Sequence, residues 1–307
     1  MDRMARFTLS ACGVVMLAPM LAQAQLWTWT KDQMMEYTKA WTGDRFADGR
    51  PKVPDALIER ARGLSMEEIM VNFGTPGGRG GGGGGYNQYV GDWQVLHPGK
   101  KMVGRAVTVQ FMPARGDLDS VVVAKAREKG IQTLNNQYAI DTLQPGDVLV
   151  VDLMGRKEGG TIVGDNLFYY IMTATKKGGL VVEGGIRDLE GIAEMDMPCY
   201  FRAVHPSAIG GVTLAGVNVP IRMGNVTVMP GDLVVGDREG ITFIPPQSAQ
   251  QILDRADETH VHDEWTRKKF DEGKYKSSEI YCSPRDPALQ KEYKEYLQKR
   301  LDEIRKK

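Results

Sequence analysis

Several features that would assign this chain to a common class are scarce. Its 307 residues include three cysteines, too few for a disulfide scaffold. Cys199 and Cys282 could pair in an oxidising compartment, but a buried, free Cys199 fits the sequence equally well. Because 39 basic residues balance 39 acidic ones, charge gives no reason to expect binding to nucleic acid or to an anionic membrane.

Short motifs of several enzyme classes are also missing. No G-x-G-x-x-G or G-x-S-x-G pattern lies in a strand-to-helix context. Of the four histidines, His97 and His205 each precede a proline, and His260 and His262 lie two residues apart, on different sides of a helix. The sequence therefore disfavours a histidine-based zinc site.

Residues 1–24 resemble an export signal. A basic start is followed by an apolar run from Leu9 to Met20 and by a small-x-small cleavage site at Ala22 to Ala24. The run is too short for a good membrane span, so we expect cleavage after Ala24 and a soluble exported protein. Cys12 lies in a lipoprotein-like box, but too little hydrophobic sequence precedes it to favour lipidation.

The remaining chain divides into four segments by composition. Residues 25–74 predict short helices, one of them after Pro54 and one opened by a capping box at Ser65. Residues 75–89 are a glycine-rich loop, either a mobile linker or an active-site flap carrying Tyr86 and Asn87. Residues 90–250 predict a mixed α/β core, and residues 251–307 predict charged helices.

The core alternates strands with short helices. Strands are expected in GRAVTVQFMPA, QPGDVLVVDL, LVVEGG, PCYFRAV, VTLAGVNVPI, VTVMPGDLVVGD and GITFIPP, with helices in DLDSVVVAKAREKG and from Asp165 onwards. In the last predicted helix, an apolar stripe predicts packing on a partner surface; its members are Leu289, Tyr293, Leu297, Leu301 and Ile304.

Arg187 and Asp188 adjoin each other where the strand LVVEGG ends. One interpretation makes them a solvated surface pair after a turn at Gly184 and Gly185. The other places them at the carboxyl edge of a parallel sheet, where side chains line ligand crevices and glycines admit a ligand to the backbone.

Asp165 favours the second interpretation. It opens the helix before this strand, and a strand-helix-strand unit returns the chain to the same sheet edge, so Asp165 can meet Arg187 and Asp188. A hard divalent cation prefers such oxygen ligands, while Arg187 suits a substrate carboxylate and the amides near Asn166 suit an oxyanion. Asp165 alone could equally be a helix cap.

A series of motifs resembles the RraA-like family, which includes the 4-hydroxy-4-methyl-2-oxoglutarate aldolases. These motifs are PGDVLVVD, GTIVGDNL, GLVVEGGIRDLEGI, PCYFRAVHP and VNVPIRMGNVTVMPGDLVVGDREGITFIP. The resemblance implies a three-layer β/β/α sandwich of the swivelling phosphohistidine type, here with N- and C-terminal helical extensions. It also implies a homotrimer or hexamer with active sites between subunits.

The resemblance further implies roles for individual residues. Asp188 would bind Mg²⁺ or Mn²⁺ directly and Asp165 would contact the metal through water. Arg187 would bind the substrate carboxylate, with the backbone at Gly164 and Asn166 meeting the substrate. Asp263 or Glu264 would supply a carboxylate from the adjacent subunit.

This chain departs from the family pattern at the same site. The spacer from Asn166 to Ile186 is one residue longer, which the Thr-Lys-Lys-Gly-Gly turn can absorb. Gly191 stands where the family usually has an acidic residue, with Glu190 before it. The export signal, the glycine-rich stretch and the helical tail also differ from the small cytoplasmic members.

We therefore expect an exported, metal-dependent carbon–carbon lyase acting on a 2-oxo acid such as 4-hydroxy-4-methyl-2-oxoglutarate or oxaloacetate. An aromatic or sugar-derived substrate stays open, because the extra segments could reshape the pocket. The alternative is a non-catalytic RraA-like interaction protein in the periplasm, although a pure binding surface would not need Asp165, Arg187 and Asp188 together.

Overall fold

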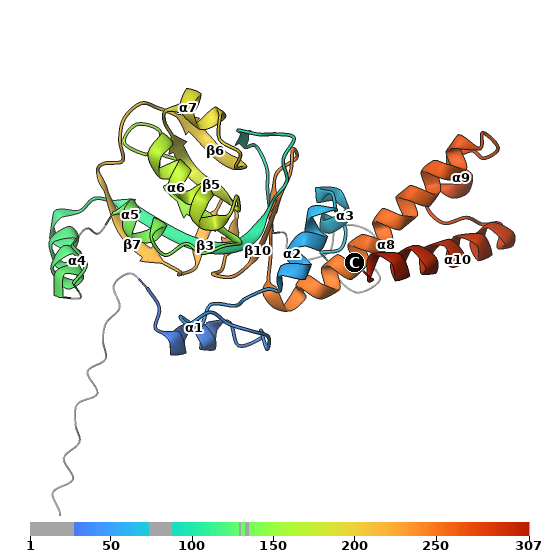
Figure 1. Ribbon diagram of the computed structural model, residues 1–307, viewed down its shortest axis with the longest axis horizontal. Helices are drawn as coiled ribbons and strands as arrows, with labels where there is room; N and C mark the ends of the chain where they lie inside the picture. Colours follow the sequence, from blue (N-terminus) through green and yellow to red (C-terminus); the bar gives the residue numbers. More distant parts are fainter. Residues whose placement is uncertain (1–27, 74–87, 129, 133–134, 307) are drawn as a thin grey trace, which may run out of the picture.

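A large mixed sheet forms the centre of the molecule (Figure 1). The computed structural model describes residues 28–73, 88–128, 130–132 and 135–306; the predicted export signal and most of the glycine-rich stretch, with Tyr86 and Asn87, lie outside them. The strand order is β1-β11-β10-β3-β4-β5-β6-β2, with β7 paired to β3. The strands are β1 (Tyr89–Val90), β2 (Gln94–Val95), β3 (Met102–Pro113), β4 (Asp147–Asp152), β5 (Gly179–Ile186), β6 (Cys199–Val204), β7 (Val212–Val217), β10 (Leu233–Gly236) and β11 (Ile241–Ile244).

Strands β3, β4, β5 and β6 run parallel and are covered on both faces. In β4, for example, Val148 and Val150 pack into one core while Leu149 and Val151 pack into the other. Because side chains alternate between the faces of a strand, a nearly continuous apolar run is the expected pattern for such a strand.

Helices cover one face of this sheet and a β-hairpin covers the other. The helices α5 (Asn136–Ile140), α6 (Asp165–Thr175) and α7 (Leu189–Ala193) pack over β3 to β6, while α2 (Asp55–Arg62), α3 (Met66–Met70) and α8 (Pro246–Asp271) pack beside β3, β10 and β11. The hairpin of β8 (Ile221–Met223) and β9 (Val226–Val228) closes the opposite core. The protein is thus a mixed α/β fold, as the sequence predicts.

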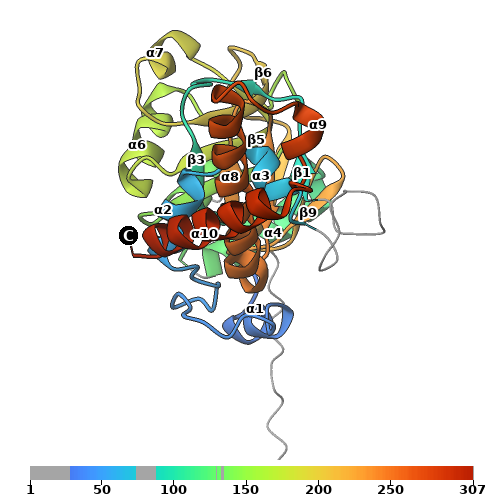
Figure 2. The same ribbon diagram turned by 90° about the vertical axis from the view of Figure 1, so that its right-hand side faces the viewer.

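The remaining helices lie outside this core. They are α1 (Lys31–Tyr37), α4 (Gly116–Glu128), α9 (Ser277–Ile280) and α10 (Pro287–Ile304). Helix α8 carries α9 and α10 away from the sheet, and α10 crosses α8 (Figures 1 and 2). The Tyr293 ring lies 5.1 Å from the Trp265 ring, and Leu301 is buried. The partner surface of the predicted apolar stripe is therefore α8 of the same chain.

The local expectations hold in some places and fail in others. Ser65 caps α3 with the predicted capping box, and α2 and α6 begin after Pro54 and at Asp165 as expected. The single strand predicted over residues 212–221 was wrong, because the chain breaks after β7 at Asn218, which has φ 52°. The strand predicted over residues 226–237 is likewise interrupted, at Gly231, which has φ 87°.

Cys199 and Cys282 are not joined by a disulfide bond. Cys199 is buried, which raises the pKa of its thiol, whereas Cys282 is exposed. Within the described part of the chain, no helix combines the length and the apolarity needed to cross a membrane.

Candidate active site

The candidate site lies just beyond the carboxyl end of β5, a central strand between β4 and β6. β5 ends at Ile186, and Asp188 then adopts the left-handed conformation, with φ 57° and ψ 42°, as the N-cap of α7. Aspartate tolerates this conformation better than most residues. The bend brings Arg187 and Asp188 off the strand at the sheet edge that the sequence predicts.

The segment that follows β4 brings Asp165 to the same place. Thr161 forms a parallel bridge with Gly185, and the Ile162 N–H donates to the Gly185 carbonyl at 3.0 Å. The Arg187 N–H in turn donates to the Val163 carbonyl at 3.1 Å. Residues 160–163 thus act as a short extra strand beside the end of β5, which places Gly164 next to Arg187 and Asp188.

The two glycines within the β5 motif serve packing. The strand continues through Gly184 and Gly185, so the predicted turn there was wrong. A Cβ atom at Gly184 would lie 2.9 Å from the Leu153 Cβ, and one at Gly185 would lie 3.2 Å from the Thr161 Cγ2. Both glycines therefore let the segment after β4 approach the strand closely.

Gly164 is enclosed by the two site residues. A Cβ atom there would lie 2.2 Å from the Asp188 Oδ2 and 3.1 Å from the Arg187 Nε. The Asp165 N–H approaches the same Asp188 oxygen at 3.4 Å. The start of α6 and the residues that follow β5 therefore meet through main-chain groups of α6 and the side chains of Arg187 and Asp188, and a side chain at position 164 would force these to shift.

Arg187 and Asp188 are paired only loosely. The Arg187 Nε lies 3.9 Å from the Asp188 Oδ2, and the side chains are 38% and 41% exposed. At such a distance the guanidinium makes no short hydrogen bond to the carboxylate. Both groups therefore keep donors and acceptors for a ligand.

Asp165 is the first residue of α6, and Gly164 is the N-cap, without a side-chain cap. The Asp165 Oδ1 accepts a hydrogen bond of 2.7 Å from the Asn166 N–H. Asp165 therefore does not occupy the capping position, although it satisfies one amide of the helix start. Substrate binding by the Asn166 amide stays a prediction and requires this carboxylate to turn away.

The donor set fits a hard divalent cation that keeps most of its waters. Within the described ranges, no three His, Cys, Asp or Glu side chains form a metal-binding group. Asp188 and Asp165 offer carboxylate oxygens at one edge, and the Asp188 side chain is 41% exposed. Mg²⁺ is commonly held by one or two carboxylates together with waters and substrate oxygens, so the residues present suffice.

Glu264 lies elsewhere, in the arm formed by α8 and α10. It accepts hydrogen bonds from Tyr296 at 2.6 Å, Lys268 at 3.2 Å and Arg300 at 3.1 Å. Burial acts to raise its pKa, but these bonds outweigh it and lower the pKa to about 2. Asp263 lies 3.5 Å from the His262 Nδ1. Whether Asp263 or Glu264 serves the site of an adjacent subunit stays a prediction.

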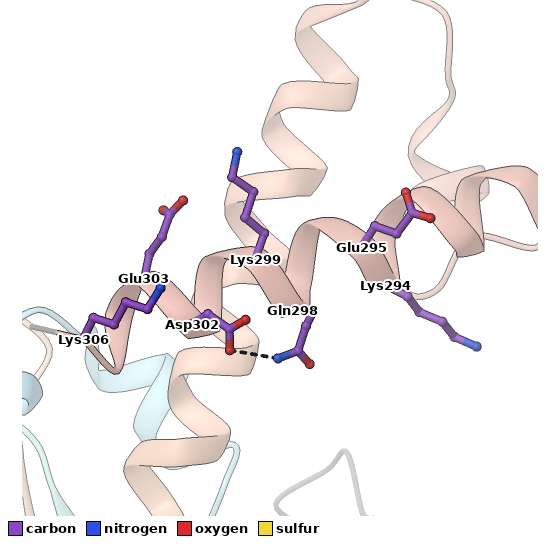
Figure 3. Close-up of a pocket in the computed structure, with 7 residues that line it drawn as sticks. All are labelled: Lys294, Glu295, Gln298, Lys299, Asp302, Glu303 and Lys306. Atoms are coloured by element: carbon purple, nitrogen blue, oxygen red, sulfur yellow. Dashed lines mark hydrogen bonds between the residues drawn. The ribbon is translucent and has the colours of Figure 1, made fainter.

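A shallow pocket on α10 has no part in this site (Figure 3). Its lining is charged apart from one amide, and it contains none of the predicted site residues. The side chains that line it are Lys294, Glu295, Gln298, Lys299, Asp302, Glu303 and Lys306.

Sequence reasoning missed the segment of residues 160–163 as an element of the site. Thr161 and Val163 align the start of α6 with β5 through main-chain contacts. The three β-branched residues Thr161, Ile162 and Val163 after two glycines are typical of a short strand and could have given the signal.

Comparison with known proteins gives a consistent result. Residues 81–243, just over half of the chain, match the profile of the family described as "RraA-like: Aldolase/RraA". A protein of Halalkalibacterium halodurans named "Putative 4-hydroxy-4-methyl-2-oxoglutarate aldolase" is 34% identical over 170 residues, which cover 55% of this chain and 71% of that protein. A protein of the same name from Azotobacter vinelandii is 37% identical over 108 residues, 34% of this chain and 64% of the relative.

The fold agrees with this assignment. The crystal structure of RraAS2 of Streptomyces coelicolor, described as an unusual member of the RNase ES inhibitor RraA protein family, matches with a TM-score of 0.58 and 28% identity. The match covers 71% of this chain and all of that one. The chain therefore belongs to the RraA-like family.

Proposed function

We propose that this protein is a divalent-metal-dependent carbon–carbon lyase, an aldolase or decarboxylase, that acts on a 2-oxo acid such as 4-hydroxy-4-methyl-2-oxoglutarate or oxaloacetate. The observation that carries the proposal is the convergence of Arg187, Asp188 and the start of α6 at one sheet edge, with both charged side chains available to a ligand. The aldolase names of the relatives support the same reaction class.

Each residue has a part in the proposed reaction. Arg187 would hold the substrate carboxylate through its planar pair of donors, which fixes the 2-oxo acid in one orientation. Asp188 would bind Mg²⁺ or Mn²⁺ directly, and Asp165 would contact it through water. When bound, such a cation acts as a Lewis acid that favours negative charge on the 2-oxo oxygen.

In the bond-breaking step, the 4-hydroxyl group of 4-hydroxy-4-methyl-2-oxoglutarate gives its proton to water, the bond between C3 and C4 breaks, and C4 leaves as the oxo carbon of one pyruvate. The electron pair of the broken bond moves toward the 2-oxo oxygen. In oxaloacetate the same bond breaks with loss of CO2. C3 then takes a proton to give pyruvate. Asp165 would orient a water for this proton transfer. The backbone at Gly164 and Asn166 would hold the substrate from the side of α6, where the amides of the helix start point outward.

The proposal extends to organisation and location. The order hairpin, sheet, helices supports a β/β/α sandwich of the swivelling phosphohistidine type. We also propose a homotrimer or hexamer with Glu264 near a neighbouring site. Export after cleavage at Ala24 rests on the signal-like pattern of residues 1–24.

The test is pyruvate release from 4-hydroxy-4-methyl-2-oxoglutarate and from oxaloacetate, with added Mg²⁺ or with chelator. Asp188→Asn should lower turnover at least about a hundredfold, the usual cost of losing a charge-stabilising group, because it removes the ligand charge while asparagine tolerates the left-handed backbone. The matched control is Asp117→Asn, an exposed aspartate on α4 that pairs with Arg115.

Turnover that resists chelator or persists in Asp188→Asn would contradict the metal role. No pyruvate release by the folded, Mg²⁺-supplied protein from either compound would favour the second candidate, a non-catalytic interaction protein. The description of the S. coelicolor neighbour as a member of an RNase inhibitor family supports that candidate.

A further inference from the structure

The end of β5 has a second flank, formed by the end of β6. Ile186 lies opposite Val204 in the parallel register, and the His205 N–H donates to the Ile186 carbonyl at 3.2 Å. His205 therefore follows β6 at the level at which Arg187 follows β5. Gly164 borders Arg187 from the other flank.

The hydrogen bonds of the His205 ring define its tautomer. The Ser207 N–H donates to the His205 Nδ1 at 3.2 Å, and the Ser207 Oγ lies 2.8 Å from the same nitrogen. A neutral imidazole has one donor and one acceptor nitrogen, so acceptance at Nδ1 places the proton on Nε2. The side chain is half-buried, and among the residues described here Nε2 makes no hydrogen bond.

The segment that holds His205 is tied to the segment that builds the site. The Gly159 N–H donates to the Ser207 Oγ at 2.7 Å, and the Thr161 hydroxyl donates to the Ser207 carbonyl. A further bond of 2.9 Å joins the Gly210 N–H to the Gly159 carbonyl. Residues 159–163 therefore support the ring of His205 on one flank and align Arg187 and the start of α6 on the other.

We propose that His205 is a substrate-binding residue of this site, whose Nε2–H donates a hydrogen bond to an oxygen of the 2-oxo acid that Arg187 holds. This inference rests on the proposed function. A neutral, directional donor beside a guanidinium restricts how a planar carboxylate and its neighbouring oxo group can lie. Ser207 is the positioning residue, because its contacts with Nδ1 keep the proton on Nε2.

The competing explanation is that His205 only stabilises the turn at Pro206. That role would affect folding stability but not the affinity for a ligand. We therefore choose oxalate, a planar and unreactive analogue of a 2-oxo acid, and measure its binding by calorimetry to the full chain in the presence of Mg²⁺. Thermal unfolding of every variant gives the structural readout.

His205→Ala should weaken oxalate binding about tenfold, the value of one hydrogen bond. His205→Gln should retain part of the affinity, because its amide nitrogen can donate from a similar position. Ser207→Ala should weaken binding less than His205→Ala. The matched control is His97→Gln, since the His97 Nε2 contacts the Met195 carbonyl at 2.7 Å and no predicted site residue.

An unchanged affinity in a folded His205→Ala protein would overturn the inference, as would an equal loss in His97→Gln. If binding is lost in Asp188→Asn but not in His205→Ala, the proposed function stands and the role of His205 falls. If the native protein binds no oxalate, both fall.

Discussion

Two arginine–aspartate pairs lie at opposite ends of the parallel strands and differ in burial, in sequence separation and in the distance between their charged groups. Arg50 and Asp147 lie 97 residues apart in the chain, are fully buried, and form two hydrogen bonds of 2.8 and 3.1 Å. Arg187 and Asp188 are adjacent in the chain, half-exposed, and 3.9 Å apart.

The buried pair directs most of its polar groups to one another and to the protein interior, although the Arg50 Nε has no hydrogen-bond partner among the described residues. The Asp147 Oδ2 also accepts from the Gln144 N–H, and Arg50 donates to the Ala106 carbonyl. This pair fastens the N-terminal segment to the start of β4. In the pair at the carboxyl ends, the Arg187 Nε and the Asp188 Oδ2 are instead 3.9 Å apart and both side chains are partly exposed, so their charges remain available. The same two side chains thus serve structure or chemistry according to burial and geometry.

The largest expected effect concerns the buried pair. Asp147→Ala should lower the free energy of unfolding by about 3–5 kcal/mol, because Arg50 would remain buried without its partner. Asp188→Asn should change it by less than about 0.5 kcal/mol, since the side chain is half-exposed. Urea unfolding of both variants measures the contrast. Equal losses would show that the two pairs do not differ as described.

A methyl group at position 164 should disturb the arrangement of Arg187 and Asp188 without removing either charge. Gly164→Ala places a Cβ atom against the Asp188 Oδ2, so turnover should fall at least about tenfold. The control is Gly116→Ala in α4, where a Cβ atom would meet nothing within 4 Å. Steady-state pyruvate release gives the comparison, and full activity in Gly164→Ala would show that the close approach is unimportant.

Unlike Asp147, which pairs with Arg50, Asp232 is a buried carboxylate with no arginine among the groups that shift its pKa. It is 1% exposed, and burial raises its pKa to about 7 despite a hydrogen bond from the Met229 N–H. The folded state therefore holds a proton that the unfolded state releases near pH 4, and stability falls as pH rises from about 4 to 7.

Asp232→Asn should remove this slope and raise stability at pH 8, relative to pH 5, by on the order of 1 kcal/mol. Urea unfolding at both pH values is the measurement. An identical pH dependence in the native protein and the variant would show that Asp232 does not titrate in this range.

Glu264 is intermediate between the two pairs, because it is partly exposed yet bound by three partners. Its pKa of about 2 means that its stabilisation is present above about pH 4.5 and is lost as the pH falls toward 2. Glu264→Gln should cost about 0.5 kcal/mol at pH 6, as expected for a screened pair, and less at pH 3. Thermal unfolding at the two pH values would detect this, and a larger cost at pH 3 would contradict it.

The elements around the site were predictable because their signals are local. The apolar runs of β4 and β5 and the helix start at Asp165 stand out in a short window of sequence, as does the order strand, helix, strand. Together with the strand-like segment of residues 160–163, that order places Asp165 at the sheet edge where Arg187 lies. The buried partner of Arg50 gave no signal, because nothing in a local window relates two residues so distant in the chain.

The sequence by itself determined the family and the mixed α/β class, and it supplied the charged residues proposed for the site, since motif order and hydrophobic periodicity are written along the chain. Only the tertiary structure decided which Arg–Asp pair is buried and which keeps its charges available. It also decided that the glycines of β5 serve packing and that His205 adjoins Arg187. These outcomes depend on strand register and close backbone approach, which arise only when distant segments pack together.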